Sequence, residues 1–161
     1  MNPRYSKEID RLYLKLYEML FEYARSSLAS DALAEEAVQD TFAIACQKPE
    51  KLCESTNPEG WLVVTLKNVL SNIKRKQNIA RRILLEYFAT NMDDISVSDD
   101  RIGVELLYDD IADLEEFKLL KEMALDGLSY LEMAQNRGIT VGTCRKRVER
   151  AKKVLQKKIQ L

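Results

Sequence analysis

The sequence predicts an all-α protein built from two small helical domains. Proline and glycine are scarce, at 3 and 5 of 161 residues, whereas the helix formers Leu, Ala, Glu and Lys are abundant. Apolar residues recur at spacings of three and four along most of the chain, which is the period of a helix with one buried face. An acidic segment at 89–111 interrupts this pattern and predicts a linker between a domain at 1–88 and a domain at 112–161.

Three helices are predicted in the N-terminal domain. The first covers about 3–28 and the second 31–47, each preceded by a residue that can cap a helix. The third starts at Pro58, because proline fits the first helical position, and it runs into the 80s. The stretch 48–57, which contains Pro49 and the small polar residues Ser55, Thr56 and Asn57, is predicted to be a loop.

Each of these helices has an apolar face that can contribute to a core. In the first helix the face comprises Leu12, Leu16, Met19, Leu20, Tyr23 and Ala24. In the second it comprises Leu33, Ala37, Val38, Thr41, Phe42 and Ala45. In the third it comprises Trp61, Leu62, Thr65, Leu66, Val69 and Ile73. We therefore expect one packed helical domain, with Phe42 and Trp61 as core residues.

The last third of the chain carries the pattern of a helix-turn-helix. Ser129, with Glu132 three residues later, forms a capping box, so a helix is predicted to start there. Gly138 supplies the left-handed residue that ends it. Thr140 can accept hydrogen bonds from the free amides of the next helix. The pattern predicts two helices joined by a tight turn.

The second of these helices has an apolar side and a basic side. Its inward stripe is predicted to be Val141, Cys144, Val148, Ala151 and Leu155. Because such a helix enters the DNA major groove with its first turns, the candidates for DNA contact are Thr140, Thr143, Arg145, Lys146, Arg147 and Arg150. Arg145 or Lys146 can read guanine through two hydrogen bonds. The alternative is that all the basic side chains of this helix contact only phosphates.

The formal net charge of −1 conceals two basic segments. Residues 67–82 hold 6 basic and no acidic residues, and residues 137–158 hold 9 basic residues and 1 acidic residue. Between them, residues 83–116 hold 1 basic and 11 acidic residues. Local patches rather than total charge determine contact with phosphates. The first patch and its amides comprise Lys67, Asn68, Asn72, Lys74, Arg75 and Lys76. Its alternative interpretation is a solvated cationic surface.

Several classes of function find no support in the sequence. Histidine is absent, and no Gly-rich phosphate loop or nucleophile paired with a base occurs, so we expect no enzyme. The 3 cysteines are far apart and form no CxxC pair, so neither a metal site nor a disulfide framework is expected. No apolar run reaches about 18 residues and no signal-peptide pattern is present, so we expect a cytoplasmic protein without membrane insertion. No cofactor is expected.

Three stretches occur in a recognisable order and spacing. They are 34–42, then 57–62 followed by Lys67-Asn68, and finally 127–143 followed by Arg150-Ala151 and Leu155. In this combination the chain resembles the extracytoplasmic-function group of bacterial sigma factors, in the sigma-70 family. The resemblance covers nearly the whole chain outside the linker.

The resemblance implies a subunit that gives bacterial RNA polymerase its promoter specificity. The implied partners are core RNA polymerase and promoter DNA, with an anti-sigma factor as a further candidate. Glu36, Gln39 and Asp40 would contact the polymerase, although by themselves they indicate a solvated face. The basic face of the third helix would recognise and melt the −10 element, and the helix-turn-helix would recognise the −35 element.

Two other classes of protein also fit parts of the pattern. One is a stand-alone transcription regulator that joins a helix-turn-helix to an N-terminal protein-interaction domain. The other is an adaptor that uses the same helices to hold protein partners. The polymerase-docking segment and the basic patch at 67–82 favour the sigma factor, because a simple regulator needs neither.

Overall fold

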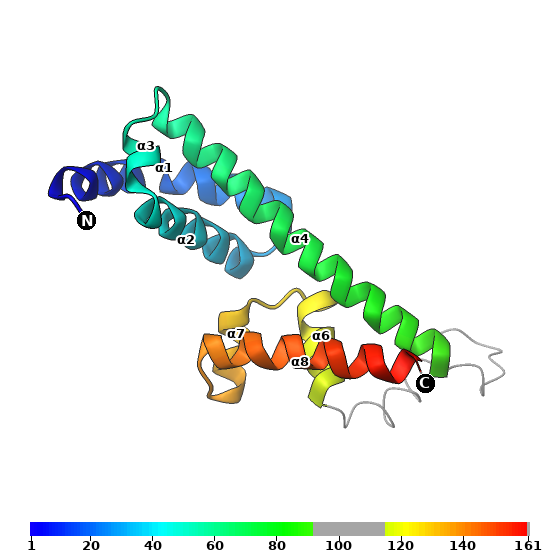
Figure 1. Cartoon of the computed structure of the whole chain (residues 1–161). Helices are drawn as coiled ribbons and strands as arrows, with labels where there is room; N and C mark the ends of the chain where they lie inside the picture. Colours follow the sequence, from blue (N-terminus) through cyan, green and yellow to red (C-terminus); the bar gives the residue numbers. More distant parts are fainter. Residues whose placement is uncertain (92–114, 161) are drawn as a thin grey trace. The chain divides into compact units, whose positions relative to one another are not determined.

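The structure of the chain, a computed structural model, describes residues 1–91 and 115–160 (Figure 1). All regular structure in these residues is helical, as the sequence predicted, and it forms seven helices. The chain divides into two compact units, Met1–Arg75 and Lys76–Leu161. The boundary between them falls inside α4, Pro58–Asn91. The predicted linker at 89–111 lies almost wholly outside the described residues. The functional domains expected at 1–88 and 112–161 remain predictions.

Helix α1, Pro3–Leu28, has the predicted bounds because its ends are fixed by local hydrogen bonds. The Asn2 side chain accepts a hydrogen bond from the amide of Arg4 at 3.0 Å, and Pro3 occupies the first turn. At the other end Ala29 adopts a left-handed conformation, with φ at 52°, and its amide donates to the carbonyl of Arg25 at 2.8 Å. The chain thereby reverses direction into the next helix.

Helix α2, Asp31–Gln47, also matches its prediction. The hydroxyl of Ser30 accepts a hydrogen bond from the amide of Leu33 at 3.2 Å and so caps its start. The prediction of a loop at 48–57 is wrong in part, since Pro49–Cys53 forms the short helix α3. A helix of one turn contains too few residues to show a hydrophobic period, which explains why the sequence pattern missed it.

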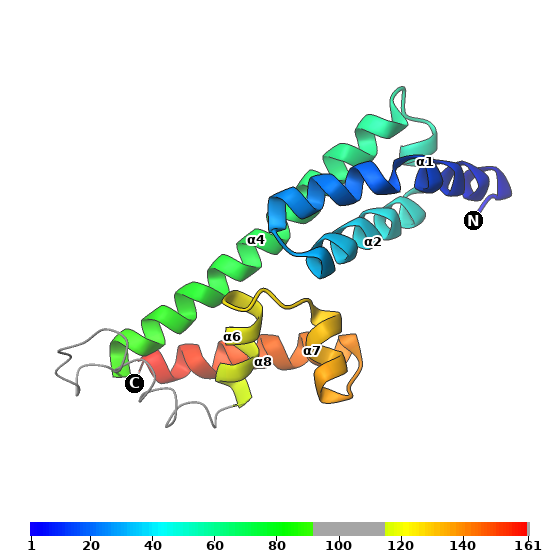
Figure 2. The ribbon, with the colours of Figure 1, turned by 180° about the vertical axis from the view of Figure 1, so that it is seen from behind.

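Figures 1 and 2 show α1 and α2 lying side by side within the first unit. The buried stripe of α1 comprises Ile9, Leu12, Leu16, Leu20 and Ala24. Met19 and Tyr23, which were predicted to share this face, are 51% and 45% exposed. Each precedes a buried residue by one position, and one position turns a helix by about 100°, which moves these two side chains out of the core.

The apolar faces of α2 and α4 follow the prediction more closely. All six residues predicted for α2 are buried, including Phe42 and the hydroxyl-bearing Thr41, whose Oγ1 donates to the carbonyl of Ala37 at 2.8 Å. Leu62, Leu66 and Val69 of α4 join the same core. The other three predicted residues of α4, Trp61, Thr65 and Ile73, are half-buried. Trp61 therefore packs on the margin of the core rather than at its centre.

The second unit combines the last turns of α4 with three further helices, α6, α7 and α8. Their bounds are Glu115–Ala124, Tyr130–Arg137 and Val141–Gln160. Ala80, Ile83, Leu84 and Tyr87 of α4 belong to one buried cluster with Phe117, Leu120, Met133, Cys144, Val148, Ala151 and Leu155. The sequence had assigned the whole of this long helix to the N-terminal domain, but its end belongs to the core of the second unit.

Hydrogen bonds and ion pairs of one arginine connect α7 to α6. Arg137 donates to Glu122 at 2.7 and 3.2 Å and to Glu115 at 2.6 Å. Its side chain is only 13% exposed, so these carboxylates compensate for much of its lost hydration. The hydrogen bond to Glu122 is the main cause that raises the pKa of Arg137 above its ordinary value. These hydrogen bonds connect α7 to α6 within the second unit.

Candidate nucleic-acid interface

The turn between α7 and α8 is built from the caps that the sequence predicted. The amide of Glu132 donates to the Ser129 hydroxyl at 3.1 Å, and the amide of Ser129 donates to the Glu132 carboxylate at 2.9 Å. Gly138, with φ at 61°, ends α7 in the left-handed region. A side chain at this position would strain the backbone. These bonds fix the angle at which α8 begins.

Thr140 and Thr143 form a hydroxyl pair at the start of α8. The amide of Thr143 donates to Thr140 Oγ1 at 3.1 Å, so Thr140 caps the helix as expected. The hydroxyl of Thr140 also donates to Thr143 Oγ1 at 2.9 Å. Both side chains are exposed. Their capping bonds leave lone pairs and the Thr143 hydroxyl proton for an external partner such as a phosphate.

Helix α8 separates its apolar and basic residues as predicted. Cys144, Val148, Ala151 and Leu155 are buried, and Val141 is partly buried against the same core. The four predicted DNA-contacting bases, Arg145, Lys146, Arg147 and Arg150, are all exposed. Within the part of the chain that the structure describes, none of these four forms an ion pair. The outer surface of α8 therefore presents unneutralised positive charge.

Two other bases of the same segment do not belong to this surface. Lys152 is 8% exposed and its ammonium lies 3.1 Å from the Glu149 carboxylate. Arg137 is held by the carboxylates of α6. Counting charges along the sequence therefore overstates the basic surface of this segment. The bases with structural partners can be recognised only when the packing of α6 to α8 is known.

One base of the α8 surface is held by an aromatic ring. The guanidinium carbon of Arg145 lies over the ring of Tyr130, 5.3 Å from its centroid. Tyr130 is the first residue of α7 and is partly buried against the core of the second unit. The sequence analysis did not anticipate this contact, because the two residues are 15 positions apart on different helices.

The second candidate surface lies on α4. Lys67, Asn68, Asn72, Lys74, Arg75 and Lys76 are all exposed, as predicted for a nucleic-acid contact. Leu66, Val69 and Leu70 are buried on the opposite side of the same turns. Residues 60–85 contain no acidic residue. Glu59, the nearest carboxylate at the start of α4, lies 2.5 Å from the ammonium of Lys15. Basic and amide side chains thus share a face of α4 that carries no acidic residue.

The predicted polymerase-contacting residues lie on α2 and differ in exposure. Gln39 is exposed, and its amide approaches the Glu35 carboxylate at 3.5 Å, the outer limit of a hydrogen bond. Glu36 and Asp40 are half-buried. The structure therefore leaves Gln39 and Glu35 the most accessible polar groups of this stretch. The roles of all three predicted residues remain predictions.

A row of aromatic side chains adjoins this polar stretch. The ring centroids of Tyr13 and Phe42 are 4.9 Å apart, and Tyr13 is followed by Tyr17 at 5.2 Å. Phe21 continues the row, with its centroid 6.1 Å from that of Tyr17. Tyr13 is 39% exposed. The spacing of four between these residues could have revealed the row in the sequence, where it was overlooked beside the leucine stripe.

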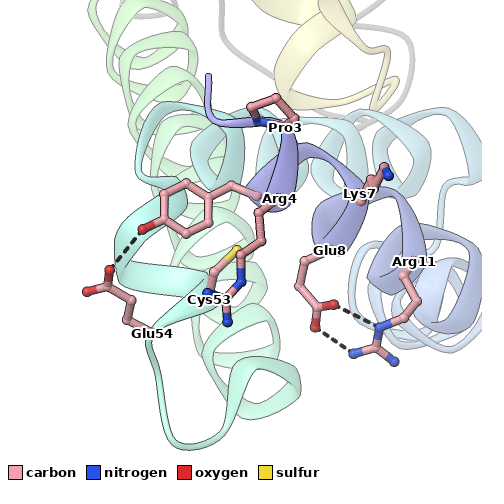
Figure 3. A pocket seen from close by; sticks show the side chains of 8 residues that line it. Pro3, Arg4, Lys7, Glu8, Arg11, Cys53 and Glu54 are labelled. Atoms are coloured by element: carbon pink, nitrogen blue, oxygen red, sulfur yellow. Dashed lines mark hydrogen bonds and ion pairs between the residues drawn. The ribbon is translucent and has the colours of Figure 1, made fainter.

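A polar hollow of about 730 Å³ lies at the other end of the first unit, between α1 and α3 (Figure 3). Tyr5 donates to the Glu54 carboxylate at 2.9 Å, and Arg11 pairs with Glu8 at 2.6 Å. The hydrogen bond from Arg11 lowers the pKa of Glu8. Burial is the main cause that raises the pKa of the Cys53 thiol at its edge, which reduces its reactivity. None of the predicted site residues lines this hollow.

Two other classes of site were sought in residues 1–91 and 115–160. No group of three or more His, Cys, Asp or Glu side chains there could hold a metal ion. None of the helices described there is long and apolar enough to cross a membrane.

The N-terminal helices also match a known family. The match is to sigma-70 region 2 and covers residues 12–80, which include α2 and the basic face of α4. Residues 12–80 are thus similar to a sigma-70 region 2 domain. Such a domain implies a sigma factor that binds core RNA polymerase and recognises the −10 element of promoters. Sigma factors are not enzymes, which confirms the expectation that this chain is not one.

Comparison with whole proteins adds nothing further. No match was found among curated proteins or among solved structures. The match to sigma-70 region 2 ends at residue 80, so it does not extend to α6, α7 or α8.

Proposed function

We propose that the chain is a sigma factor of the extracytoplasmic-function group, in which region 2 is joined to a helix-turn-helix that recognises the −35 element. The observation that carries the proposal is the combination of a sigma-70 region 2 domain at 12–80 with a second, capped and basic helix pair further along the same chain. Such a subunit acts in the cytoplasm, with the polymerase.

In this proposal α2 docks on core RNA polymerase. Gln39 is the most accessible of the three predicted residues, and Glu36 and Asp40 lie beside it on the same helix. The aromatic row headed by Tyr13 adds apolar area next to these polar groups. Interfaces commonly combine aromatic residues with a polar rim, which supports this face as the docking surface.

The basic face of α4 is assigned to the −10 element. Melting exposes bases and phosphates of a single strand, and an extruded base must be held by new contacts that repay its lost stacking. Lys67, Lys74 and Arg75 suit the phosphates. Asn68 and Asn72 each offer both a donor and an acceptor, which suits the hydrogen-bonding edge of a base.

The outer face of α8 is assigned to the −35 element. A helix that follows a tight, capped turn and presents bases in its first turns fits the major groove of duplex DNA. Arg145 and Lys146 are the candidates for reading a base, and Arg147 and Arg150 are the candidates for phosphate contact. Thr140 and Thr143, at the entry of the helix, are placed with the phosphate contacts.

In vitro transcription with purified core RNA polymerase tests the proposal. We expect the chain to direct transcripts from discrete start sites in a genomic template library. The variant Gln39→Ala/Asp40→Lys should bind core polymerase at least tenfold more weakly. A matched variant on the far side of α1, Glu18→Lys/Glu22→Ala, should bind normally. Duplex binding without any polymerase-dependent transcript would instead support a stand-alone regulator.

A further inference from the structure

Arg145 differs from the other bases on the surface of α8. Its guanidinium carbon lies 5.3 Å from the centre of the Tyr130 ring. No such ring contact, and no ion pair, is present for Lys146, Arg147 or Arg150 among the residues that the structure describes. All four side chains are exposed to solvent. Arg145 is therefore the base whose position the protein itself restrains.

The ring that restrains Arg145 is itself fixed. Tyr130 lies inside the capping box, between Ser129 and Glu132, whose two reciprocal hydrogen bonds measure 2.9 and 3.1 Å. Ser129 is only 2% exposed, and the Tyr130 ring packs against the buried cluster of the second unit. A flexible side chain on α8 thus rests on a rigid support on α7.

Stacking on a ring leaves the hydrogen-bond donors of an arginine available, whereas pairing with a carboxylate uses them. Arg137 donates to Glu115 and Glu122, so its hydrogen-bonding groups are consumed inside the protein. An aromatic face attracts the cation without accepting the hydrogen bonds along the edge of the guanidinium. The donors of Arg145 consequently stay available to an external acceptor, while its rotamer freedom is reduced before binding. Reduced freedom lowers the entropic cost of binding.

We propose that Tyr130 is a positioning residue that orients Arg145 toward one guanine in the major groove. The inference rests on the proposed function of α7 and α8 as a helix-turn-helix, and it makes Arg145 rather than Lys146 the base-reading residue. Guanine presents two acceptors on its major-groove edge, which match the paired donors of a guanidinium held in one orientation. Arg147 and Arg150, which have no such support, contact phosphates.

The test compares Tyr130→Leu, Tyr130→Phe and the unaltered full chain in binding to a duplex library with a randomised segment. The unaltered chain is assayed alone and with core polymerase, and the state with the stronger base preference is used. Tyr130→Leu should reduce the preference for guanine at one base pair about two- to fivefold, the range expected for an exposed cation–π contact. Tyr130→Phe should retain the preference, because it keeps the ring face.

The coupling between the two residues distinguishes positioning from a structural role. Arg145→Ala should lose the preference at the same base pair, and adding Tyr130→Leu to it should change nothing further at that position. A general loss of stability would instead lower binding at all base pairs and in both backgrounds. Hydrogen exchange of the α7 and α8 amides provides the control for folding.

Three results would overturn the positioning role: an unchanged preference in Tyr130→Leu, an equal loss in Tyr130→Phe, or a loss spread evenly over the site. An unaltered chain with no base preference in either state would contradict the −35 assignment itself, and the role of Tyr130 with it. A clear preference that depends on Lys146 and not on Arg145 would leave the −35 assignment intact and refute the inference alone.

Discussion

The basic faces of α4 and α8 carry comparable charge but hold their side chains differently. On α8 the bases follow a turn fixed by three caps, and Arg145 rests on the ring of Tyr130. On α4 the bases lie in the middle of a long helix and alternate with the amides Asn68 and Asn72. On α8 a ring contact restrains one of the four basic residues, whereas no such contact is present for the basic residues of α4 among the described residues.

Under the proposed function, this difference matches two kinds of nucleic acid. Duplex DNA presents base edges at fixed positions in the major groove, so a preset arginine can meet its acceptor without rearrangement. A melted strand has no fixed geometry, so amide and basic side chains that can reorient are suited to bind it. If the proposed function is correct, side-chain restraint, and not charge alone, distinguishes the surface for duplex DNA from the surface for single strands. Four predictions test this contrast, in order of decreasing effect.

The largest effect is expected when the α4 face loses its charge. The variant Lys67→Ala/Lys74→Ala/Arg75→Ala should bind single-stranded −10 DNA more than tenfold more weakly in complex with polymerase. The slope of its logarithmic binding constant against the logarithm of the salt concentration should become less steep by about 2, because each phosphate contact to a single strand contributes about 0.7. Filter binding at several salt concentrations measures both quantities.

The control for this variant is Arg4→Ala/Lys7→Ala/Lys51→Ala, which removes three exposed bases elsewhere in the first unit. It should retain nearly normal affinity. Equal losses in the two variants would mean that total charge, rather than the α4 face, determines binding.

The second prediction separates two arginines of α8. Arg145→Ala should cost about 1–3 kcal/mol and relax the preference at one base pair, whereas Arg150→Ala should weaken all sequences alike and lower the salt slope by about 1. Competition binding with single-base variants of the −35 duplex distinguishes the two outcomes. Identical profiles for both variants would remove the contrast between a restrained and an unrestrained arginine.

The third prediction contrasts an arginine that supports the fold with one on the exposed basic face of α8. Arg137→Ala should destabilise the second unit by about 2 kcal/mol, since it leaves the partly buried carboxylate of Glu122, and the exposed one of Glu115, without their charged donor. Arg150→Ala should change stability by no more than about 0.5 kcal/mol, as is usual for an exposed residue. Urea denaturation monitored by hydrogen exchange in α6 and α7 gives both values. Similar stability losses in the two variants would show that the ion pairs of Arg137 contribute little to the stability of the second unit.

The smallest effects are expected at the helix caps. Ser129→Ala removes the hydroxyl of a capping box that is 2% exposed and should cost about 1–2 kcal/mol. Asn57→Ala removes the bond from the Gly60 amide, 3.0 Å long and exposed, and should cost about 0.5–1 kcal/mol. Thermal unfolding of the two variants shows which substitution costs more stability. A larger cost at Asn57 would contradict the view that the α7–α8 turn is the more tightly fixed of the two.

The ends of the helices could be predicted from the sequence because they depend on neighbouring residues. Asn2, Ser30, Ser129 and Gly138 act within one turn of their own positions, and each caps a helix as expected. The short helix α3 contains too few residues to show a period. Met19 and Tyr23 were misplaced because large apolar side chains flank the true stripe on α1.

The contacts that define the candidate surfaces could be predicted only in part. Exposure of the bases on α4 and α8 follows from their position opposite the apolar stripe, so it was anticipated. The partners of Arg137 and the ring beneath Arg145 depend on how α6, α7 and α8 pack together. A charge count cannot separate an arginine that supports the fold from one that faces solvent, because both have the same composition and differ only in their tertiary neighbours.

The most direct test of this account is permanganate reactivity of thymines in a promoter bound by the chain and core RNA polymerase. The unaltered chain should expose reactive thymines around the −10 element. Asn68→Ala/Asn72→Ala should lower that reactivity while the −35 footprint persists, and Arg145→Ala should weaken the footprint and the reactivity together. Absence of polymerase-dependent opening by the unaltered chain, or loss of the −35 footprint in the α4 variant, would contradict the division of roles between the two faces.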